Sequence, residues 1–316
     1  MACPIGEVLA PWNIHVGRTG SLFTVLRRAA AAERIAAIPS RSVWHPCQVT
    51  VLKVSARNAR FQQWRALLSN RVKRQRSGTF LVHGVRPITL AVDRGWPLEA
   101  LLYPAGRRLS RWADELLAQT TATRVEMAPD LLADLGDKTE DTPELVAVAR
   151  MPADRLDHIQ VGVEFLGVVF DRPTSPGNLG TVMRSADAFG ADGVIVSGHA
   201  ADVYDPKTVR ASTGSLFTVP VVRAESAAAV LEWIRDRRPG VRIVGTDENG
   251  TEDVALHDLT GPTLLVIGNE TMGMSSQWRQ ACDSVVCIPI GGGASSLNAA
   301  TAATVVLYEA VRQRRG

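Results

Sequence analysis

Apolar positions in the first half of the chain predict short helices and strands in alternation. Phe61, Trp64, Leu67 and Leu68 recur at helical spacing, which predicts a helix with Trp64 in the core. Short apolar runs and further helical periods predict strands over 80–84, 100–103 and 145–149, and helices over 88–92 and 112–117. Strands that alternate with short helices predict a compact α/β domain over residues 55–150.

The second half differs, because its predicted strands are apolar at nearly every position. They fall at 165–170, 193–196, 242–245, 263–267 and 285–288, with helices over 179–188 and 227–235. Strands without polar alternation are typical of a parallel sheet covered by helices on both faces. We predict a second α/β domain over 164–316, after a linker over 151–163. A last helix, from Leu297 to about Arg312, is apolar on most sides, which predicts burial in the sheet packing or a subunit interface.

Composition narrows the class of protein. The chain has 316 residues, 46% of them hydrophobic, which suits two globular domains. No apolar run approaches the ~18 residues of a membrane-spanning helix, and no secretory signal is evident, so we expect a cytoplasmic protein. The four cysteines lack C-x-x-C pairing and zinc-finger spacing, so we expect reduced thiols, Cys282 and Cys287 in the core, and no metal site. Residues 1–54 are predicted to be a flexible extension; the alternative is an organelle transit peptide.

The charge distribution is uneven. Between Glu33 and Asp93 the sequence has no acidic residue but eleven Lys and Arg. Such a block is either a solvated basic face or a surface that binds nucleic acid. Its densest part contains four basic residues within six positions: Arg71, Lys73, Arg74 and Arg76.

Common nucleotide-binding motifs are absent. The sequence has no G-x-x-x-x-G-K-[ST] loop, and no G-x-G-x-x-G follows the first strand of the second domain. Three other segments lie where a predicted strand ends and a helix begins: 171–184 with Phe189-Gly190, 267–273 and 288–300. The strand-to-helix junctions of a parallel sheet form the rim where ligands bind.

These three segments resemble motifs one, two and three of the SpoU (TrmH) family in the SPOUT superfamily of methyltransferases. The first matches N-x-G-x-x-x-R…F-G, with Asn178, Gly180, Arg184, Phe189 and Gly190. The second matches G-x-E-x-x-G, with Gly268, Glu270 and Gly273. The third matches I-P-x…S-L-N, with Ile288, Pro289, Ser296, Leu297 and Asn298. The first domain resembles the family's L30-like substrate-binding domain in Ser55–Asn58, the basic run, 80–84 and Lys138–Glu140 before 145–149.

The resemblance implies a function and a fold. It implies an S-adenosylmethionine-dependent methyltransferase acting on a ribose 2′-hydroxyl of structured RNA, either rRNA or tRNA. The fold class it implies is α/β: a knotted (trefoil) parallel-sheet SPOUT domain after a smaller L30-like α/β domain. It further implies a homodimer whose active site draws on both subunits. The alternatives are a SPOUT-fold RNA-binding protein without catalysis and a base methyltransferase; a housekeeping and an antibiotic-resistance role both stay open.

The resemblance also assigns roles to single residues. Backbone groups of Gly268, Ile288 and Leu297 are expected to contact the cofactor, together with Asn298, while Thr246 borders the adenosine.

Five residues are expected to be catalytic: Arg184, Asn178, Glu270, Ser296 and Asn298. The family role proposed for Arg184 is deprotonation of the 2′-hydroxyl; because a guanidinium holds its proton tightly, stabilisation of the developing alkoxide is an equal alternative. Asn178, Ser296 and Asn298 could also cap helices, and Glu270 could be a carboxylate at a helix N-terminus.

RNA contacts are expected mainly in the first domain. Arg71, Lys73, Arg74 and Arg76 are the predicted phosphate ligands. Around the start of a predicted helix in the second domain, Asp205, Lys207 and Arg210 are better interpreted as a solvated helix face than as RNA contacts.

Overall fold

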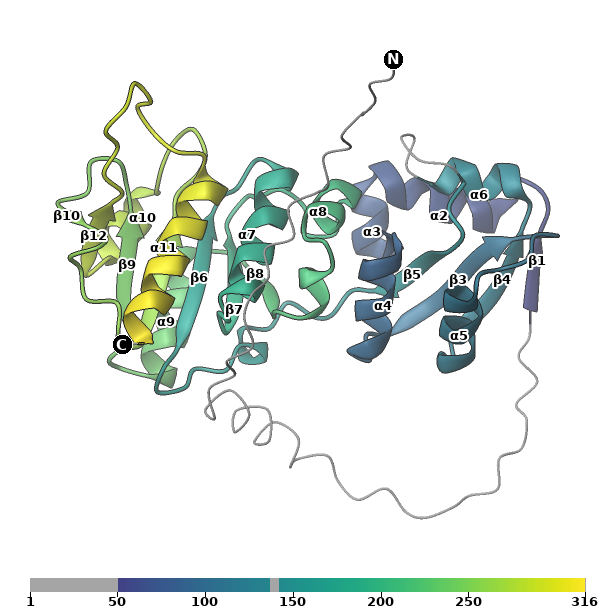
Figure 1. Cartoon of the computed structure of the whole chain (residues 1–316), viewed down its shortest axis with the longest axis horizontal. Coiled ribbons are helices and arrows are strands. Elements are labelled where there is room, and N and C mark those ends of the chain that lie inside the picture. The colour runs from purple at the N-terminus through teal and green to yellow at the C-terminus, as the bar shows by residue number, and fades with distance from the viewer. Residues whose placement is uncertain (1–50, 137–141, 316) are drawn as a thin grey trace, which may run out of the picture. The chain divides into compact units, whose positions relative to one another are not determined.

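The computed structural model describes residues 51–136 and 142–315, within a compact unit that spans Val49–Gly316 (Figure 1). The predicted extension up to residue 50 and the Lys138–Glu140 match lie outside the described residues. Val51–Val54 correct the predicted boundary, because they form strand β1, which pairs in parallel with β4 (Thr123–Met127). Val54 is buried, so the first domain begins before Ser55.

The first domain is built on a five-stranded sheet in the order β1-β4-β3-β5-β2. The strands β2, β3 and β5 span Thr79–His83, Leu98–Pro104 and Val146–Arg150, and β5 is antiparallel to both its neighbours. The helices are α2 (Ala59–Ser69), α3 (Arg71–Ser77), α4 (Val85–Asp93), α5 (Arg111–Gln119) and α6 (Pro129–Leu135). The predicted strands and helices are confirmed; β4, α3 and α6 were not predicted, because polar residues interrupt or replace the apolar positions of these short elements.

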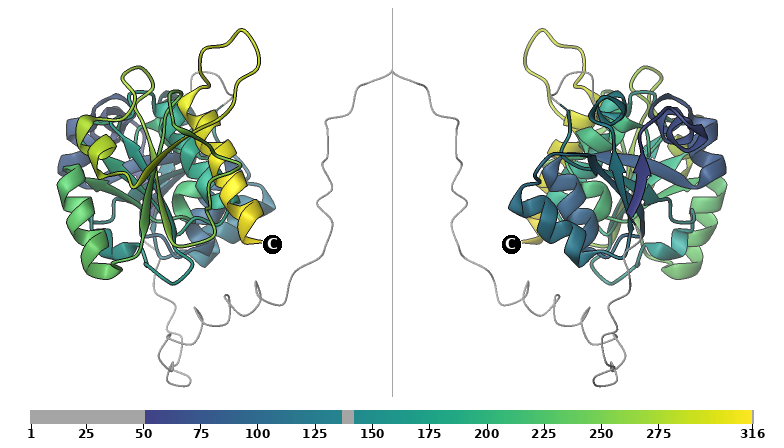
Figure 2. Two further views of the ribbon diagram at one scale, coloured as in Figure 1. Left: turned by 90° about the vertical axis from the view of Figure 1, so that its left-hand side faces the viewer. Right: turned by 90° about the vertical axis from the view of Figure 1, so that its right-hand side faces the viewer.

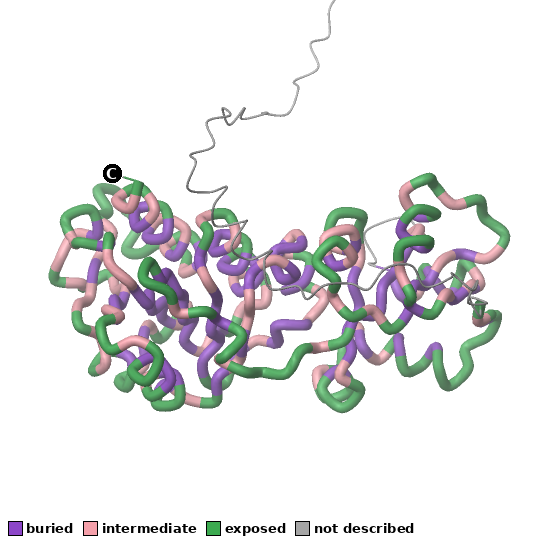
Figure 3. The backbone as a smooth tube through the Cα atoms, turned by 90° about the horizontal axis from the view of Figure 1, so that it is seen from below, coloured by how far each residue is buried: buried purple, intermediate pink, exposed green. Residues whose placement is uncertain are grey.

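Two hydrophobic clusters cover the two faces of this sheet. One joins residues of α2 and α6 to the strands and contains Phe61 and Trp64, which confirms the prediction that Trp64 is a core residue. The other contains residues of α4 and α5 and continues into the second domain through Tyr204 and Phe217. The two predicted domains therefore share part of one core. Buried positions follow the strands in both domains (Figure 3).

The basic run is a helix of its own. Asn70 separates α3 from α2: its backbone N–H donates to Ala66, and its side chain accepts from Lys73 N. Gly78 ends α3 in the left-handed conformation that glycine adopts at low cost, with φ at 63°. Helical geometry then gives the basic side chains different directions, and the residues of α3 do not share one surface.

The second domain contains a seven-stranded parallel sheet in the order β10-β12-β9-β11-β6-β7-β8. Its strands are β6 (Leu166–Asp171), β7 (Gly193–Ser197), β8 (Val221–Ala224), β9 (Arg242–Thr246), β10 (Glu252–Asp253), β11 (Thr263–Ile267) and β12 (Ser284–Cys287). The five predicted strands and the parallel sheet are confirmed. The unpredicted β8 and β10 are its short edge strands.

Helices cover both faces of this sheet (Figure 2). Helices α7 (Pro176–Ala188) and α11 (Ala299–Arg314) pack together on one face, and α9 (Ala227–Arg237) and α10 (Ser276–Ala281) lie on the other. The short α8 (Pro206–Ala211) packs against α7. Helix α11 is buried on one side only; Tyr308 on its other side is 56% exposed.

The linker and the two C-terminal cysteines are partly buried against the second domain. The linker contains a short 3-10 helix, Leu156–His158, and its Ile159 packs against Gly193 at the start of β7. Cys282 and Cys287 are free thiols that are half-buried rather than fully buried. Burial raises the pKa of Cys282 to about 11, so this thiol stays protonated at neutral pH. Within the described residues, no helix is long and apolar enough to cross a membrane. The trefoil knot stays a prediction.

Candidate active site

The three motif segments leave the same edge of the parallel sheet. Asp171 ends β6, Gly268 follows β11, and Ile288 follows β12. Parallel strands place their carboxyl ends at one edge, and a pocket of about 480 Å³ lies there. The residues predicted to contact the cofactor all belong to this pocket or adjoin it: Thr246, Gly268, Ile288 and Leu297 line it, and Asn298 follows Leu297.

Gly268 is required by a close backbone approach. A Cβ atom at this position would lie 2.5 Å from the backbone nitrogen of Met274 and 2.6 Å from the carbonyl carbon of Gly273. Both contacts are with backbone, so no side chain could move aside to make room. The loop over 268–274 therefore folds back on itself beside the pocket only with glycine here.

Glu270 connects the second motif to the first. Its carboxylate accepts hydrogen bonds from the backbone N–H groups of Thr174 (2.9 Å) and Ser175 (3.0 Å), and from Asn178 Nδ2 (3.2 Å). Burial alone would raise the pKa of Glu270, but these donors outweigh it and lower the pKa below the ordinary value. Glu270 is therefore an anion held against the N-terminus of α7.

Asn178 connects the first motif to the third. Its Oδ1 accepts a hydrogen bond of 3.0 Å from Asn298 Nδ2. The cap of α7 is Ser175, whose Oγ accepts from Asn178 N, so the alternative that Asn178 caps this helix is wrong. Asn298 is the cap of α11, accepting from Ala300 N and Thr301 N, while its amide group contacts Asn178. Glu270, Asn178 and Asn298 thus form one chain of hydrogen bonds through all three motifs.

Arg184 and Ser296 lie differently. Ser296 is exposed and lines the pocket. Arg184 is exposed on α7 and does not line the pocket; no hydrogen bond or ion pair of its side chain is formed with another described residue. The nearby surface of α7 and α11 carries Phe189 and Tyr308, whose rings contact edge to face at 6.0 Å. A single subunit therefore brings four of the five predicted catalytic residues to the pocket region, but not the guanidinium.

Sequence reasoning missed two further acids near the pocket. Asp171 is 2% exposed and accepts from Ser275 N at 2.7 Å, which joins the first motif to the start of α10. Asp247 lines the pocket and forms an ion pair with Arg279. Burial alone would raise the pKa of Asp247, but hydrogen bonds from Asn249 and Arg279 outweigh this effect, so the pKa lies below its ordinary value. Each acid lies where an apolar strand ends, and this pattern in the sequence could have indicated both residues as candidates for the site.

Backbone strain marks the turn after β6. Arg172 has φ at 50°, an uncommon value for a non-glycine residue. Its carbonyl oxygen accepts from Asn269 Nδ2 at 2.6 Å, and its side chain bonds Asp171 and the carbonyl of Gly273. The second motif thus holds this turn in its strained form.

The four predicted phosphate ligands are separated by the fold. Lys73 and Arg76 are exposed, and Arg71 is half-exposed and donates to the carbonyl of Ala200 at 2.7 Å. Arg74 corrects the prediction: its side chain is 2% exposed and forms an ion pair with Asp202 at 2.8 Å. A guanidinium buried against a carboxylate has no surface left to offer a phosphate. Of the residues expected on a solvated helix face, Asp205 also contacts Arg74.

Comparison with known proteins identifies matches to two family models, one for each domain. Residues 58–147 match the SpoU L30e-like domain, and residues 166–308 match the SpoU rRNA methylase family. A 23S rRNA (uridine(2479)-2′-O)-methyltransferase of Streptomyces viridochromogenes is 61% identical over 265 residues, which cover 83% of this chain and 92% of that protein.

The chain belongs to the SpoU rRNA methylase family.

Solved structures of family members agree. The SpoU methyltransferase AviRb from Streptomyces viridochromogenes, in complex with S-adenosylmethionine, superposes with a TM-score of 0.79 at 62% identity, over 82% of this chain and 99% of that one. An S-adenosylmethionine-bound rRNA methyltransferase from Sinorhizobium meliloti gives a TM-score of 0.74 at 30% identity, over 83% and 98% of the two chains.

The predicted fold class, apart from the knot, and the predicted enzyme class and cofactor are thereby confirmed. The chain is an S-adenosylmethionine-dependent RNA methyltransferase that acts on a ribose 2′-hydroxyl, with an L30e-like domain before the catalytic domain. The alternatives of a non-catalytic RNA-binding protein and of a base methyltransferase find no support among these relatives.

Proposed function

We propose that this enzyme methylates the 2′-hydroxyl of a single uridine in the 23S rRNA of the large ribosomal subunit. The observation that carries the proposal is the 61% identity, over 83% of this chain, to an enzyme named for that reaction. The chain of hydrogen bonds from Glu270 through Asn178 to Asn298 supports it, because it joins the three motifs around one pocket. Such a substrate puts the enzyme in the cytoplasm, with the ribosomes.

The pocket fits S-adenosylmethionine in size and chemistry. Its volume of about 480 Å³ lies in the range of small-molecule sites, ~300–1,000 Å³. Ile288 and Leu297 supply apolar walls for the adenine, and the backbone at Gly268 allows close approach. Three carboxylates, of Asp247, Glu248 and Glu270, line the pocket against one guanidinium, of Arg279, and this excess of negative charge suits a cationic ligand. The cofactor supplies a methyl group on a positively charged sulfur.

The remaining work of the active site is alignment and charge stabilisation. In-line methyl transfer requires the attacking ribose oxygen to face the methyl carbon, and holding reactants in line supplies much of the rate. In our proposal Asn178 and Asn298 orient the ribose, and Glu270 holds both motif loops in place. Ser296, on the exposed loop, closes the site over the cofactor.

Arg184 acts across a homodimer in this proposal. Its guanidinium is exposed and does not line the pocket of its own subunit, so a second subunit must bring it there. Exposed apolar side chains on this side, Tyr308 on α11 and Leu297 in the third motif, offer the contact surface. Positioned at the ribose, Arg184 stabilises the negative charge that develops on the 2′-oxygen.

The first domain holds the RNA. Lys73 and Arg76 are exposed on α3, and we propose that they contact phosphates, together with the half-exposed Arg71 on another side of the helix. Phosphate contacts fix the position of an RNA on a protein without reading its sequence.

Transfer of labelled methyl groups to 23S rRNA, 16S rRNA and tRNA from a strain lacking the modification tests the proposal. The wild type should label only 23S rRNA, as 2′-O-methyluridine. Arg184→Ala should abolish labelling, whereas Arg235→Ala, the same change on the exposed side of α9, should not. Label in tRNA or 16S rRNA, or on a base, would overturn the substrate assignment. Unimpaired transfer by Arg184→Ala would remove Arg184 from the site.

A further inference from the structure

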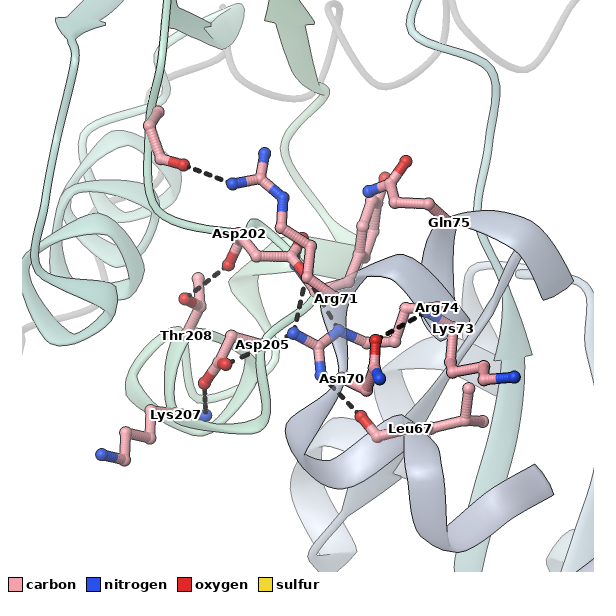
Figure 4. A network of polar contacts seen from close by, with 12 residues as sticks. Leu67, Asn70, Arg71, Lys73, Arg74, Gln75, Asp202, Asp205, Lys207 and Thr208 are labelled. Atoms are coloured by element: carbon pink, nitrogen blue, oxygen red, sulfur yellow. Dashed lines mark hydrogen bonds and ion pairs between the residues drawn. The ribbon is translucent and has the colours of Figure 1, made fainter. Parts of the chain in front are cut away.

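A buried cluster of charges lies between α3 and the loop before α8 (Figure 4). Arg74 on α3 donates from Nε to Asp202 Oδ2 at 2.8 Å, and its Nη2 lies 3.4 Å from Asp205 Oδ2. A third bond, from Nη1 to the carbonyl of Leu67 at 2.6 Å, holds the guanidinium to its own domain. The side chains of Arg74 and Asp202 are 2% and 4% exposed. Because its three acceptors lie in fixed directions, the guanidinium can satisfy all of them in one orientation only.

Contacts on either side of this cluster restrict the interface further. Arg71 reaches the carbonyl of Ala200 at 2.7 Å. Phe80 of β2 packs on Tyr204, with ring centroids 4.7 Å apart, and Trp96 meets Phe217 edge to face at 5.1 Å. The two ring contacts are apolar and tolerate small sliding movements, whereas the hydrogen bond from Arg71 is charged and directional, like those of the buried cluster. The charged cluster is directional, because a guanidinium presents its donors in a rigid plane.

The cluster also leads to the helix that carries the proposed active-site residues. Asp205 is the N-cap of α8, accepting from Lys207 N through Oδ1 while Oδ2 faces Arg74. Helix α8 in turn lies against α7 without a gap, because a Cβ on Gly180 would come within 2.5 Å of the carbonyl oxygen of Thr208. Gly180 lies on α7 between Asn178 and Arg184. Backbone contact leaves little freedom between α8 and α7.

We propose that Arg74, Asp202 and Asp205 set the offset between the phosphate-binding surface of α3 and helix α7, and thereby determine which ribose of the bound RNA is methylated. They are positioning residues that act through the protein, and the proposal rests on the proposed function of the enzyme. Lys73 and Arg76 fix the RNA on α3, and Arg74, between them in sequence, fixes α3 on the catalytic domain. Helix α3 thus contacts both the RNA and the catalytic domain, and its position fixes the distance between the bound phosphates and α7.

The required precision supports this assignment. Successive nucleotides of one strand advance only ~3.4 Å along a helical nucleic acid. A shift of that size between α3 and α7 presents a neighbouring ribose to the active site. A misplacement of ~1 Å can cost about 10²-fold in rate, so the interface must hold its position more tightly than apolar packing alone requires.

The variants Asp202→Asn and Asp205→Asn test the proposal while keeping the size of each side chain and its hydrogen bond to the local backbone. Asparagine keeps the Oδ1 acceptor for Tyr204 N at position 202 and for Lys207 N at position 205, and it caps helices as well as aspartate. Each change replaces the carboxylate oxygen that faces Arg74 by an amide NH2 group, so both the charge and the acceptor there are lost. Asp134→Asn is the control for each single variant, because it removes the partner of the exposed Arg57 within the first domain and raises the net charge by one, as each of them does.

The measurement is the distribution of 2′-O-methyl groups along 23S rRNA, read nucleotide by nucleotide, together with kcat, KM and cofactor Kd. The double variant should lose about tenfold to 10²-fold in kcat at the original uridine and gain methyl groups at adjacent riboses. Its KM for RNA and its cofactor Kd should stay unchanged, because both binding surfaces remain. Asp134→Asn should behave like the wild type.

Three outcomes separate the possible failures. Methylation of the original uridine alone, at the wild-type kcat, by a folded double variant would overturn the inference and leave the proposed function intact. An equal loss at all riboses with weakened cofactor binding would also overturn it, because that pattern reports general destabilisation. A wild-type enzyme that methylates no 23S rRNA would overturn the proposed function itself. In that case, small-angle scattering should still show a broader range of domain separations in the double variant than in the wild type. This comparison tests the role of the Arg74 cluster independently of RNA.

Discussion

Arg74 and Arg184 were both predicted to act on RNA, and the fold treats them in opposite ways. Arg74 is 2% exposed and lies against Asp202 and Asp205, which are distant in sequence. Arg184 is exposed and has no such partner among the described residues. The difference teaches that a basic residue is available to a phosphate only where the fold brings no carboxylate to it. A run of basic residues cannot reveal this, because the carboxylates come from another part of the chain.

The comparison has an energetic side. Removing a charge from water costs several kcal/mol, and only well-placed partners offset this. Three acceptors offset this cost for Arg74 and fix its position. The exposed Arg184 contributes almost nothing to stability, and its charge is available to the substrate. Substitutions at the two sites should therefore affect different quantities.

The largest expected effect is on stability. Arg74→Met should lower the free energy of unfolding by about 3–5 kcal/mol, because Asp202 would stay buried without its partner. Urea denaturation measures this loss. Adding Asp202→Asn to Arg74→Met should recover part of it, because no unpaired charge then remains. If the double variant were as unstable as the two single losses added together, the ion pair would not be the cause.

Arg184→Ala should show the reverse pattern. We expect kcat to fall by about 10²–10³-fold, equivalent to ~2.7–4 kcal/mol, because one stabilising group for the developing oxyanion is lost. The free energy of unfolding should change by less than ~0.5 kcal/mol, as for other exposed positions. Kinetics and denaturation of the same preparation test both. A stability loss near that of Arg74→Met would erase the distinction between the two arginines.

Glu270 should make the active-site loops sensitive to acid. Its pKa is lowered in the folded protein, so its stabilising effect is fully present above the unfolded value near 4.5 and is lost as the pH falls through the lower folded value. Glu270→Gln should cost ~1–3 kcal/mol at neutral pH, because charge-assisted bonds to Thr174 and Ser175 are lost. Denaturation against pH should show a fall below pH 4.5 that is smaller in the variant. Equal slopes in both proteins would mean that Glu270 is not a charged partner here.

The smallest effect concerns the other basic residues of α3. Lys73→Ala with Arg76→Ala should weaken RNA binding and reduce the slope of log affinity against log salt by about 1.4–1.8, the value for two lost phosphate contacts. Fluorescence anisotropy with an rRNA fragment at several salt concentrations measures the slope. Arg235→Ala with Arg238→Ala, on α9 and at its C-cap, removes equal charge and should leave the slope unchanged. An unchanged slope in the α3 variant would place the RNA elsewhere.

Prediction from sequence succeeded where a local pattern carries the information. The five strands of the catalytic sheet follow from continuous apolar runs, because helices cover both faces of that sheet, and helix α2 follows from its periodicity, because only one side of it is buried. The short edge strands β8 and β10 escaped, since two to four residues show no period. Strand β1 escaped because its pairing partner, β4, is more than 60 residues away and its role as an edge strand is decided by that partner.

The site was predicted in part. Residues expected at the cofactor pocket gather there because each follows a parallel strand, and parallel strands end at one edge. The alternative that Asn178 caps α7 is wrong, because Ser175 starts this helix earlier than the apolar pattern indicates. That one-turn difference frees the Asn178 side chain for Glu270 and Asn298.

The sequence by itself determined the positions of the three motifs and, through their resemblance to a known family, indicated the cofactor and the reaction, because these are carried by residue types at short, fixed spacings. Only the tertiary structure decided which residues are partners: Arg74 with Asp202, Glu270 with the start of α7, and α8 with α7 at Gly180. Each pairing joins segments whose separation in space cannot be read from their separation in sequence. The physical reason is that burial and electrostatic contact depend on distance through the folded protein, which packing of the whole core establishes.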